Sequence, residues 1–259
     1  MKKNFVLRQE PFGYTFFDKP KIRYQFLHKK EVEKFLKDRQ IRTNQVEILK
    51  FKRKDYRKNI LYSPIRIYYE LTLACNLRCR YCYNSSGEPR SNELSTSEIL
   101  KSLDHFKQYN VLDIRFTGGE PTCKNDWFEI LKHAKSLSFA VSCNTNAAYY
   151  NPKINEQFAR LNLEQVAVSL DGDKKSHEMN RGKGTFDRTV ENIKNMHSMG
   201  VKLRINTLVN KYSAKDVEKV LEIASKYTDE INFFTIVFIG RGSPLVSTDG
   251  INLKDHYVM

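Results

Sequence analysis

The feature that most constrains the fold of this chain is a regular alternation of short apolar stretches with amphipathic ones, beginning at Ile65. Six stretches are rich in β-branched and aromatic residues and read as strands, and five longer stretches between them carry apolar residues at helical spacing. The strands are expected at residues 65–73, 111–118, 139–145, 165–172, 202–210 and 231–240. Because a helix separates each strand from the next, the strands should run parallel in one sheet. The alternation therefore predicts an α/β fold, in the form of a partial (β/α)6 barrel.

The expected helices bring the notable loops to one edge of that sheet. Helices are predicted at residues 95–109, 125–137, 151–161, 185–200 and 213–227. The first begins at Ser95, with Glu98 three residues later completing a capping box. In a TIM-like barrel the chemistry lies where the strands end. A cysteine-rich loop follows the first strand, and residues 118–121, 144–147 and 169–172 follow the next three, so these four loops should meet.

Residues 1–60 differ from the rest of the chain in the pattern of expected elements and in net charge. Three short strands, a helix and a basic connector are expected there, at residues 5–10, 13–18, 21–27, 30–40 and 49–59. The segment carries 18 Lys and Arg against 7 Asp and Glu, a charge of +11 out of the chain's +14. An α+β unit of about 60 residues has only a small core. We therefore expect a small basic N-terminal domain (1–60) that packs on the barrel domain (61–259) or on a partner.

Composition and hydropathy indicate the cellular compartment in which the protein is expected. Hydrophobic residues make up 40% and charged residues 29% of the 259 residues, as in globular domains and unlike disordered chains. The longest apolar run, at residues 231–240, is far shorter than the roughly 20 residues that cross a bilayer. No apolar stretch follows the basic N-terminus, as a secretion signal requires. We therefore expect a cytoplasmic protein without a membrane segment.

Three of the five cysteines, Cys75, Cys79 and Cys82, lie in one loop with C-x3-C-x2-C spacing. An odd number of cysteines, clustered in this way, argues against a disulfide framework and for a metal site. Thiolates bind iron–sulfur clusters or zinc. Zinc is the alternative, but a structural zinc takes four ligands, and neither Cys123 nor Cys143 belongs to a second pair. Three thiolates on a 4Fe–4S cluster leave one iron open to a further ligand.

The cysteine loop and a second loop resemble a known family. Tyr81 stands directly before the last cysteine, and residues 117–121, TGGEP, follow the second strand. Together they resemble the radical S-adenosylmethionine (SAM) superfamily. The resemblance implies that Cys75, Cys79 and Cys82 hold one 4Fe–4S cluster, that its open iron chelates SAM, and that Tyr81 lies at the cofactors. It also implies that an external one-electron donor, such as flavodoxin or ferredoxin, reduces the cluster, which cleaves SAM so that hydrogen is abstracted from a substrate.

The residues after the second strand have a direct physical interpretation. Gly118 and Gly119 let the backbone approach a ligand closely, where a Cβ would clash. Glu120 offers a carboxylate to the methionine ammonium of SAM, in a charge-assisted hydrogen bond. By themselves these residues are typical of an ordinary turn. Behind the cysteine loop and at the same sheet edge, they indicate SAM binding.

Further cofactor residues follow from a resemblance to the branch of the family that modifies peptides and proteins and often carries a C-terminal SPASM domain. Residues 169–172 and 177–187 carry this resemblance. It places Ser169 near the ribose or carboxylate of SAM and Arg181 on the carboxylate, which Arg binds in bidentate fashion better than Lys. Val209, at the end of the fifth strand, lends its backbone to the adenine. The alternatives are a helix-capping arginine and a packed strand residue.

Three other residues have less specific interpretations. Asn146 stands where the family often has Thr-Asn-Gly, but Ala147 takes the place of the glycine, so the turn can differ. Asp171 is a candidate catalytic residue that faces substrate, with a turn-capping role as the alternative. His177 is expected to be a loop or capping residue rather than a general base.

The remaining cysteines bear on further clusters. SPASM-type proteins hold additional clusters with cysteines beyond the barrel, whereas only Cys123 and Cys143 remain here and both lie inside it. We therefore expect no second cluster, and a buried apolar position for Cys123, with a position near the active site as the alternative. Residues 251–259 resemble the start of a helix more than a finished terminus, so we expect a chain truncated at its C-terminus, with a natural short form as the alternative.

The N-terminal segment bears on the substrate. Residues 4–40 resemble the peptide-recognition domains of ribosomal-peptide maturases, winged-helix folds that bind a leader peptide by strand addition. A basic edge favours acidic leader peptides. The leading hypothesis is a radical SAM enzyme that modifies a peptide or a peptide-derived cofactor precursor. The alternatives are a nucleotide- or RNA-modifying radical SAM enzyme, which the basic segment favours, and a zinc-binding scaffold protein.

Overall fold

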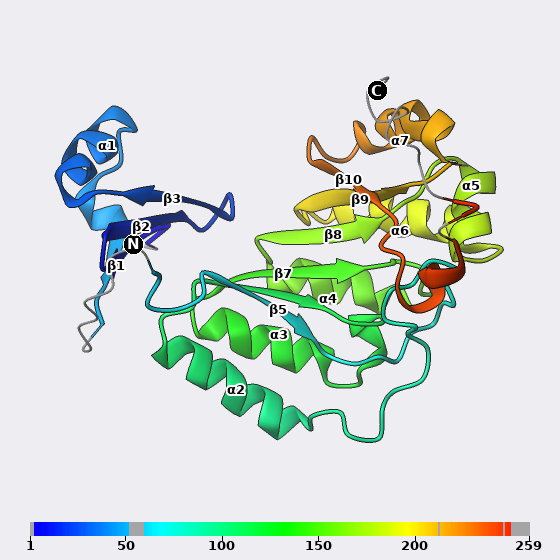
Figure 1. Cartoon of the computed structure of the whole chain (residues 1–259), viewed down its shortest axis with the longest axis horizontal. Coiled ribbons are helices and arrows are strands. Elements are labelled where there is room, and N and C mark those ends of the chain that lie inside the picture. Colours follow the sequence, from blue (N-terminus) through cyan, green and yellow to red (C-terminus); the bar gives the residue numbers. More distant parts are fainter. Residues whose placement is uncertain (1–2, 52–59, 212, 246, 250–259) are drawn as a thin grey trace.

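The computed structural model describes residues 3–51, 60–211, 213–245 and 247–249, which form two β-sheets with helices around them (Figure 1). The expected connector falls partly on residues 52–59, and the expected start of a C-terminal helix falls on residues 250–259. Both stretches lie outside the described residues. No helix in the described part of the chain is long and apolar enough to cross a membrane.

The larger sheet contains the six strands that the alternation predicts. They are β5 (Arg66–Glu70), β6 (Asp113–Thr117), β7 (Ala140–Thr145), β8 (Gln165–Ser169), β9 (Leu203–Val209) and β10 (Ile231–Thr235). The strands lie in chain order, and each pairs in parallel with the next. The first and last strands do not pair with each other (Figure 1), so the expected partial barrel is confirmed as a six-stranded half-barrel.

Helices follow the strands and cover the outer face of the half-barrel (Figure 1). The predicted ones are α2 (Thr96–Gln108), α3 (Trp127–Ser136), α4 (Lys153–Leu161), α6 (Thr185–Ser198) and α7 (Val217–Ala224). Short 3₁₀ helices are η1 (Lys29–Glu31), η2 (Thr43–Gln45), η3 (Pro121–Cys123), η4 (Ala214–Asp216) and η5 (Gly240–Leu245). The capping box of α2 forms as predicted, because the Ser95 side chain accepts the Glu98 N–H and the Glu98 carboxylate accepts the Ser95 N–H.

One helix is not predicted by the sequence pattern. α5 (Lys174–Arg181) lies between β8 and α6, and its sequence KKSHEMNR has no apolar periodicity. Its start is stabilised by Asp173, whose carboxylate accepts the Ser176 N–H at 2.8 Å. His177 therefore lies in a helix and is fully buried, and the expected loop or capping position was wrong.

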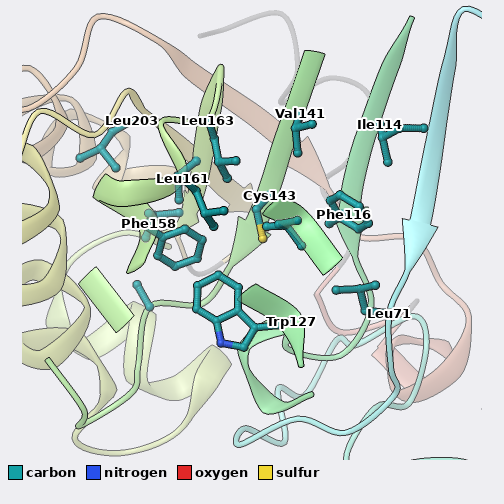
Figure 2. Packing of buried hydrophobic residues seen from close by; sticks show 14 of the residues in the cluster. Leu71, Ile114, Phe116, Trp127, Val141, Cys143, Phe158, Leu161, Leu163 and Leu203 are labelled. Atoms are coloured by element: carbon teal, nitrogen blue, oxygen red, sulfur yellow. The ribbon is translucent and has the colours of Figure 1, made fainter. Parts of the chain in front are cut away.

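The outer face of the large sheet forms the main hydrophobic core (Figure 2). Phe116 of β6 and Val141 of β7 belong to one cluster with Trp127 of α3 and Phe158 of α4. The rings of Trp127 and Phe158 lie 4.8 Å apart between centroids. Burial of these side chains holds the strands against the helices, which leaves the inner face of the sheet available for polar residues.

The N-terminal sheet has four strands where three are expected. They are β1 (Phe5–Glu10), β2 (Gly13–Asp18), β3 (Arg23–Leu27) and β4 (Val46–Leu49), in the order β3-β2-β1-β4. β4 pairs parallel to β1, and with four residues it is too short to show a clear alternation. α1 (Val32–Asp38) packs on one face, where Leu36 and Phe16 share a core cluster.

A buried arginine joins the N-terminal sheet to the half-barrel. Arg8 of β1 has no exposed surface and pairs with Glu10 at 2.6 Å. Its guanidinium also donates to the carbonyls of Ser63, Pro64 and Asn110, at 2.8–3.0 Å. Ser63 and Pro64 precede β5 and Asn110 precedes β6, so these bonds lie at the end of the half-barrel where its strands begin. Of the two possibilities left open by the sequence, the segment therefore packs on the barrel.

Candidate functional site

A cavity of about 220 Å³ lies at the end of the half-barrel where the strands end. The loops after β5, β6 and β7 meet there with the end of β8, as the predicted topology requires. The segment after β10 also contributes to the wall. The lining residues are Cys75, Leu77, Cys79, Tyr81, Cys82, Tyr83, Ser86, Thr117, Gly118, Gly119, Asn144, Thr145, Asn146, Ser169, Arg181, Asn206 and Arg241.

Cys75, Cys79 and Cys82 all line this cavity, and none forms a disulfide. The Sγ of Cys75 accepts the Leu77 N–H at 3.4 Å and lies 3.9 Å from the Nδ2 of Asn146. Such donors favour the thiolate. Burial raises the pKa of the metal-free Cys75 thiol to about 12, so a cationic centre is needed to hold it ionised.

The arrangement of the thiols bears on the kind of metal centre. In the described part of the chain, no three His, Cys, Asp or Glu side chains surround one metal-ion position. A zinc ion holds all its ligands within about 2.3 Å of a single point. An iron–sulfur cube binds each thiolate at a different iron. Cys75, Cys79 and Cys82 line one cavity, where each can serve as a thiolate ligand.

An arginine that the sequence analysis did not identify holds the cysteine loop. Arg241 donates from Nε to the Cys79 carbonyl and from Nη1 to the Ser86 carbonyl, each at 2.8 Å. The preceding Gly240 has a φ of 55°, and a Cβ there would lie 2.2 Å from the carbonyl oxygen of Tyr83. The segment after β10 therefore packs directly on the loop. The only signal in the sequence is a glycine on each side of the arginine.

The glycine pair after β6 lines the cavity, but its close contacts are with the chain itself. A Cβ on Gly118 would lie 2.4 Å from the Thr72 carbonyl oxygen, and one on Gly119 would lie 2.3 Å from that of Ala74. The Gly119 N–H donates to the Thr72 carbonyl at 2.8 Å. The two glycines therefore let the start of the cysteine loop pack against the end of β6.

Glu120 lies beside the cavity and does not line it. Its carboxylate accepts the hydroxyls of Thr122 and Thr145 and the Asn146 N–H, at 2.7–2.9 Å. Burial raises the pKa of Glu120, and these hydrogen bonds oppose the shift. The carboxylate fastens the turn after β7 to the turn after β6, and its contact with the methionine ammonium of SAM stays a prediction.

The turn after β7 contains a residue in the left-handed backbone region, which glycine usually occupies, but the residue here is an alanine. Ala147 has a φ of 51°, in the left-handed region, and its side chain is buried in the main core. Asn146 lines the cavity and donates from Nδ2 to the Oδ1 of Asn76 at 2.8 Å. Alanine in place of the family's glycine therefore leaves the left-handed turn intact.

One wall of the cavity rests on a buried ion pair. Arg181, the last residue of α5, donates from Nε to Asp171 at 2.7 Å, and its guanidinium lies 5.5 Å from the ring centroid of Tyr81. The Tyr81 hydroxyl and the Leu208 N–H also donate to Asp171. Burial favours the neutral acid, but the charge of Arg181 and the hydrogen bonds from Arg181 and Tyr81 together outweigh it, so the pKa of Asp171 is lowered. Asp171 therefore faces protein donors, in conflict with the expected substrate-facing role, whereas Arg181 and Tyr81 line the cavity.

Of the remaining candidate site residues, Ser169 lines the cavity and the others do not. Ser169 lines it at the end of β8, whereas Val209 is buried at the end of β9 and does not. The Nδ1 of His177 accepts the Asp171 N–H at 3.2 Å, and burial lowers the pKa of His177 to about 4, so the ring is neutral. Cys123 is exposed, and the expectation that it is buried was wrong.

Two asparagines in the cavity were not identified from the sequence. Asn144 and Asn206 point inward from β7 and β9, and the Oδ1 of each is buried without a hydrogen-bond partner among the described residues. The available signal is a polar residue at every second position of an otherwise apolar strand.

A parallel half-barrel with three free thiols at the carboxyl ends of its strands has the architecture of a metal-cofactor enzyme. A model of the Radical SAM superfamily matches residues 69–224, which is more than half of the chain. The chain therefore belongs to the radical SAM superfamily, so the resemblance seen in the sequence is confirmed. The superfamily uses a 4Fe–4S cluster and SAM.

The curated relatives include maturases and heme synthases. Mycofactocin maturase MftC of Mycolicibacterium smegmatis is 30% identical over 185 residues, which cover 71% of this chain and 47% of MftC. AdoMet-dependent heme synthase of Methanosarcina barkeri is 30% identical over 184 residues, which cover 70% of this chain and 53% of that protein. The chain thus spans about half the length of the curated relatives it matches.

Among solved structures, Streptococcus suis SuiB bound to precursor peptide SuiA has a similar fold. The TM-score is 0.73, and the match covers 92% of this chain and 63% of SuiB at 20% sequence identity. The match therefore extends beyond the half-barrel into the N-terminal segment.

Proposed function

We propose that this chain abstracts hydrogen from a peptide, or from a peptide-derived cofactor precursor, by reductive cleavage of SAM. In this proposal Cys75, Cys79 and Cys82 hold one 4Fe–4S cluster whose fourth iron binds SAM. A cytoplasmic one-electron donor such as flavodoxin or ferredoxin reduces the cluster.

The observation that carries the cluster assignment is that three thiols, and no fourth, line one cavity. Cys123 is exposed and Cys143 is packed in the core on the outer face of the sheet, and neither lines the cavity. A fourth thiolate would close the last corner of the cluster, whereas three leave one iron open.

The residues of the chain orient and shield the cofactors in this proposal. Leu77 and Asn146 donate toward the Sγ of Cys75, and hydrogen bonds to sulfur tune the potential of a cluster. The Ser169 hydroxyl and the guanidinium of Arg181 offer donors to the carboxylate of SAM. When bound, the cluster supplies the electron that cleaves the sulfonium and so starts hydrogen abstraction from the substrate.

The remaining candidates support the methionine and adenosine parts of SAM in this proposal. The backbone of Gly118 and Gly119 forms the wall along the methionine part, beside Tyr81. Glu120 offers its Oε2, which accepts only the Asn146 N–H among the described residues, to the methionine ammonium, while Oε1 is held by Thr122 and Thr145. A backbone contact of Val209 with the adenine stays a prediction.

Two observations support a peptide substrate. The SuiB structure that this chain resembles holds a precursor peptide. In the part of the chain that the structure describes, the outer edge of β3 pairs with no strand, and Tyr24 and Phe26 on it are half exposed. An unpaired edge can accept an extended peptide by backbone hydrogen bonds. We therefore propose β3 as the edge that binds part of the peptide.

The cluster assignment is tested by a matched pair of cysteine variants after anaerobic reconstitution. The wild-type protein is expected to bind about four irons per chain and to form 5′-deoxyadenosine from SAM and dithionite. Cys79→Ser should lose both, whereas Cys123→Ser should retain both because Cys123 lies outside the cavity. Zinc without iron in the wild-type protein, or full 5′-deoxyadenosine formation by Cys79→Ser, would contradict the assignment.

The substrate class is tested separately, because the +11 charge of residues 1–60 also suits RNA. Peptides encoded near this chain's gene and a transfer RNA mixture are compared for binding over a range of salt concentrations. Peptide binding that weakens little with salt supports the proposal. RNA binding that falls steeply with salt, without peptide binding, favours the RNA-modifying alternative.

A further inference from the structure

The concave face of the half-barrel holds a second cavity, of about 590 Å³, which the proposed function does not use. Inward residues of all six strands line it, together with the turn between β2 and β3. Asn144 and Asn206 line both cavities, so the second cavity adjoins the proposed cofactor site. Five cationic side chains and only two carboxylates, Asp229 and Glu230, line it.

Two of these cations form no ion pair, although Glu230 acts on Arg204, and Asp113 on Arg115, as a more distant negative charge. Arg66 pairs with the buried Asp113. Arg115 and Arg204, with only 7% and 9% of their surface exposed, form no ion pair with any residue that the structure describes. Arg115 donates only to hydroxyl groups, such as that of Ser142 at 3.1 Å. The Nε of Arg204 has no hydrogen-bond partner among the described residues.

Polar and small residues of β7 and β8 lie between the two arginines. Ser142 of β7 is the register partner of Arg115, and Ala167 of β8 is the register partner of Arg204. On the same two strands Asn144 and Gln165 line the cavity, with Arg115 and Arg204 on the strands to either side. Burial and the charge of Arg115 lower the pKa of Arg204 to about 10, so the two cations are near enough to repel each other.

Two buried like charges without a partner destabilise a fold unless a ligand neutralises them. A guanidinium matches the geometry of a carboxylate in paired hydrogen bonds. We propose that Arg115 and Arg204 form a carboxylate-binding subsite, which holds an acidic side chain of the peptide substrate next to the cofactor cavity. That the ligand belongs to a peptide substrate rests on the proposed function. That the ligand is a carboxylate rests on the geometry of the two arginines.

The first test is thermal unfolding of the reconstituted protein. Arg204→Met and Arg115→Met each remove an uncompensated buried charge and should raise Tm by about 3 °C or more. Arg66→Met is the matched control: it removes the partner of buried Asp113 and should lower Tm by at least as much. A lower Tm for Arg204→Met, in parallel with the control, would assign the arginine a structural role and overturn the proposal.

The second test is binding of the tripeptide acetyl-Gly-Glu-Gly-amide, followed by saturation-transfer NMR against its Gln counterpart. The wild-type protein should prefer the Glu peptide. The combined Arg115→Met, Arg204→Met variant should lose about tenfold or more of that affinity, as for the loss of a charge-assisted hydrogen bond. Equal binding of the Glu and Gln peptides would overturn the subsite. Stronger binding of free glutarate or of inorganic phosphate would overturn its assignment to an acidic side chain of a peptide.

Formation of 5′-deoxyadenosine without peptide is measured on the same samples, so that the two proposals fail separately. If the wild-type protein forms none but discriminates Glu from Gln through the arginines, the radical chemistry fails and the subsite stands. If 5′-deoxyadenosine forms and the discrimination is absent, only the subsite fails.

Discussion

The two faces of the six-stranded sheet differ in chemistry although they alternate along the same strands. On the outer face Ile114, Phe116 and Val141 are completely buried under helices (Figure 2). On the inner face Arg115, between Ile114 and Phe116, and Asn144, which follows the outward Cys143, line a cavity. Because successive side chains of a strand point to opposite faces, a single strand supplies both environments.

This difference shows where stability and function reside in the half-barrel. Parallel strands covered on both faces usually read as continuous apolar runs. Here the inner positions depart from that rule, as with Arg204 and Asn206 on β9. The outer face therefore holds the sheet together, and the inner face supplies polar residues to the two cavities.

The sharpest test of this comparison pairs two aromatic residues from the two faces of neighbouring strands. Phe116→Ala should destabilise the fold by about 3–5 kcal/mol, because it empties a fully buried site. Tyr68→Ala should cost about 1 kcal/mol or less, because Tyr68 is 59% exposed and mainly contacts the Arg115 guanidinium. Urea denaturation of both variants measures the difference. Equal losses would show that the inner face is also part of the core.

The outer face could be predicted from the sequence more fully than the rest of the fold. Its strands and amphipathic helices carry periodic apolar residues, and Ser95 and Glu98 mark a helix start by local chemistry. α5 and β4 were missed for opposite reasons: α5 has polar residues throughout, and β4 has only four residues. Neither offers enough periodicity to indicate a helix or a strand.

The parts of the site that follow from the topology of the sheet were predicted from the sequence. The contacts between residues far apart in the sequence were missed. Strand ends of a parallel sheet meet at one edge, so the cysteine loop, Gly118 and Ser169 come together as expected. Arg241 lies 162 residues from its partner Cys79, and nothing local marks that contact. Likewise, spacing alone cannot show that Asp171 takes Arg181 as its partner instead of facing substrate.

Acid sensitivity provides a second contrast, because the titratable members of the apolar cluster, Tyr69, Cys143 and Tyr149, have raised pKa values and stay neutral in acid, whereas His177 lies beside the site. The pKa of His177 is lowered to about 4 in the folded state, so above about pH 6.5 neither state is charged. As the pH falls from about 6.5 to about 4, only the unfolded chain gains the proton. Stability should therefore fall by on the order of 3 kcal/mol in this window.

Urea denaturation at several pH values, with His177→Asn beside the wild-type protein, measures this effect. The Asn side chain can still accept the Asp171 N–H but does not titrate, so the variant should lack this loss. His105→Asn changes an exposed residue and should follow the wild-type curve. A His177→Asn variant that loses as much stability as the wild-type protein would place the acid sensitivity elsewhere.

The smallest expected effect on stability is at the turn after β7, where the chain passes from the cavity to the outer core. Asn146 lines the cavity, and the next residue, Ala147, is buried in the outer core with a φ of 51°. Ala147→Gly removes a left-handed strain of about 1–2 kcal/mol. It also loses a buried methyl group, about 0.8 kcal/mol, and adds freedom to the unfolded chain, about 0.4–1 kcal/mol.

These opposing terms nearly cancel, so Ala147→Gly should change the free energy of unfolding by less than about 1 kcal/mol. Ala147→Val has no such compensation, because a β-branched residue fits the left-handed region poorly, and it should cost more than about 2 kcal/mol. Urea denaturation of the two variants ranks them. If Ala147→Val is tolerated, the turn has room to change its handedness, and the boundary between cavity and core at this position is not rigid.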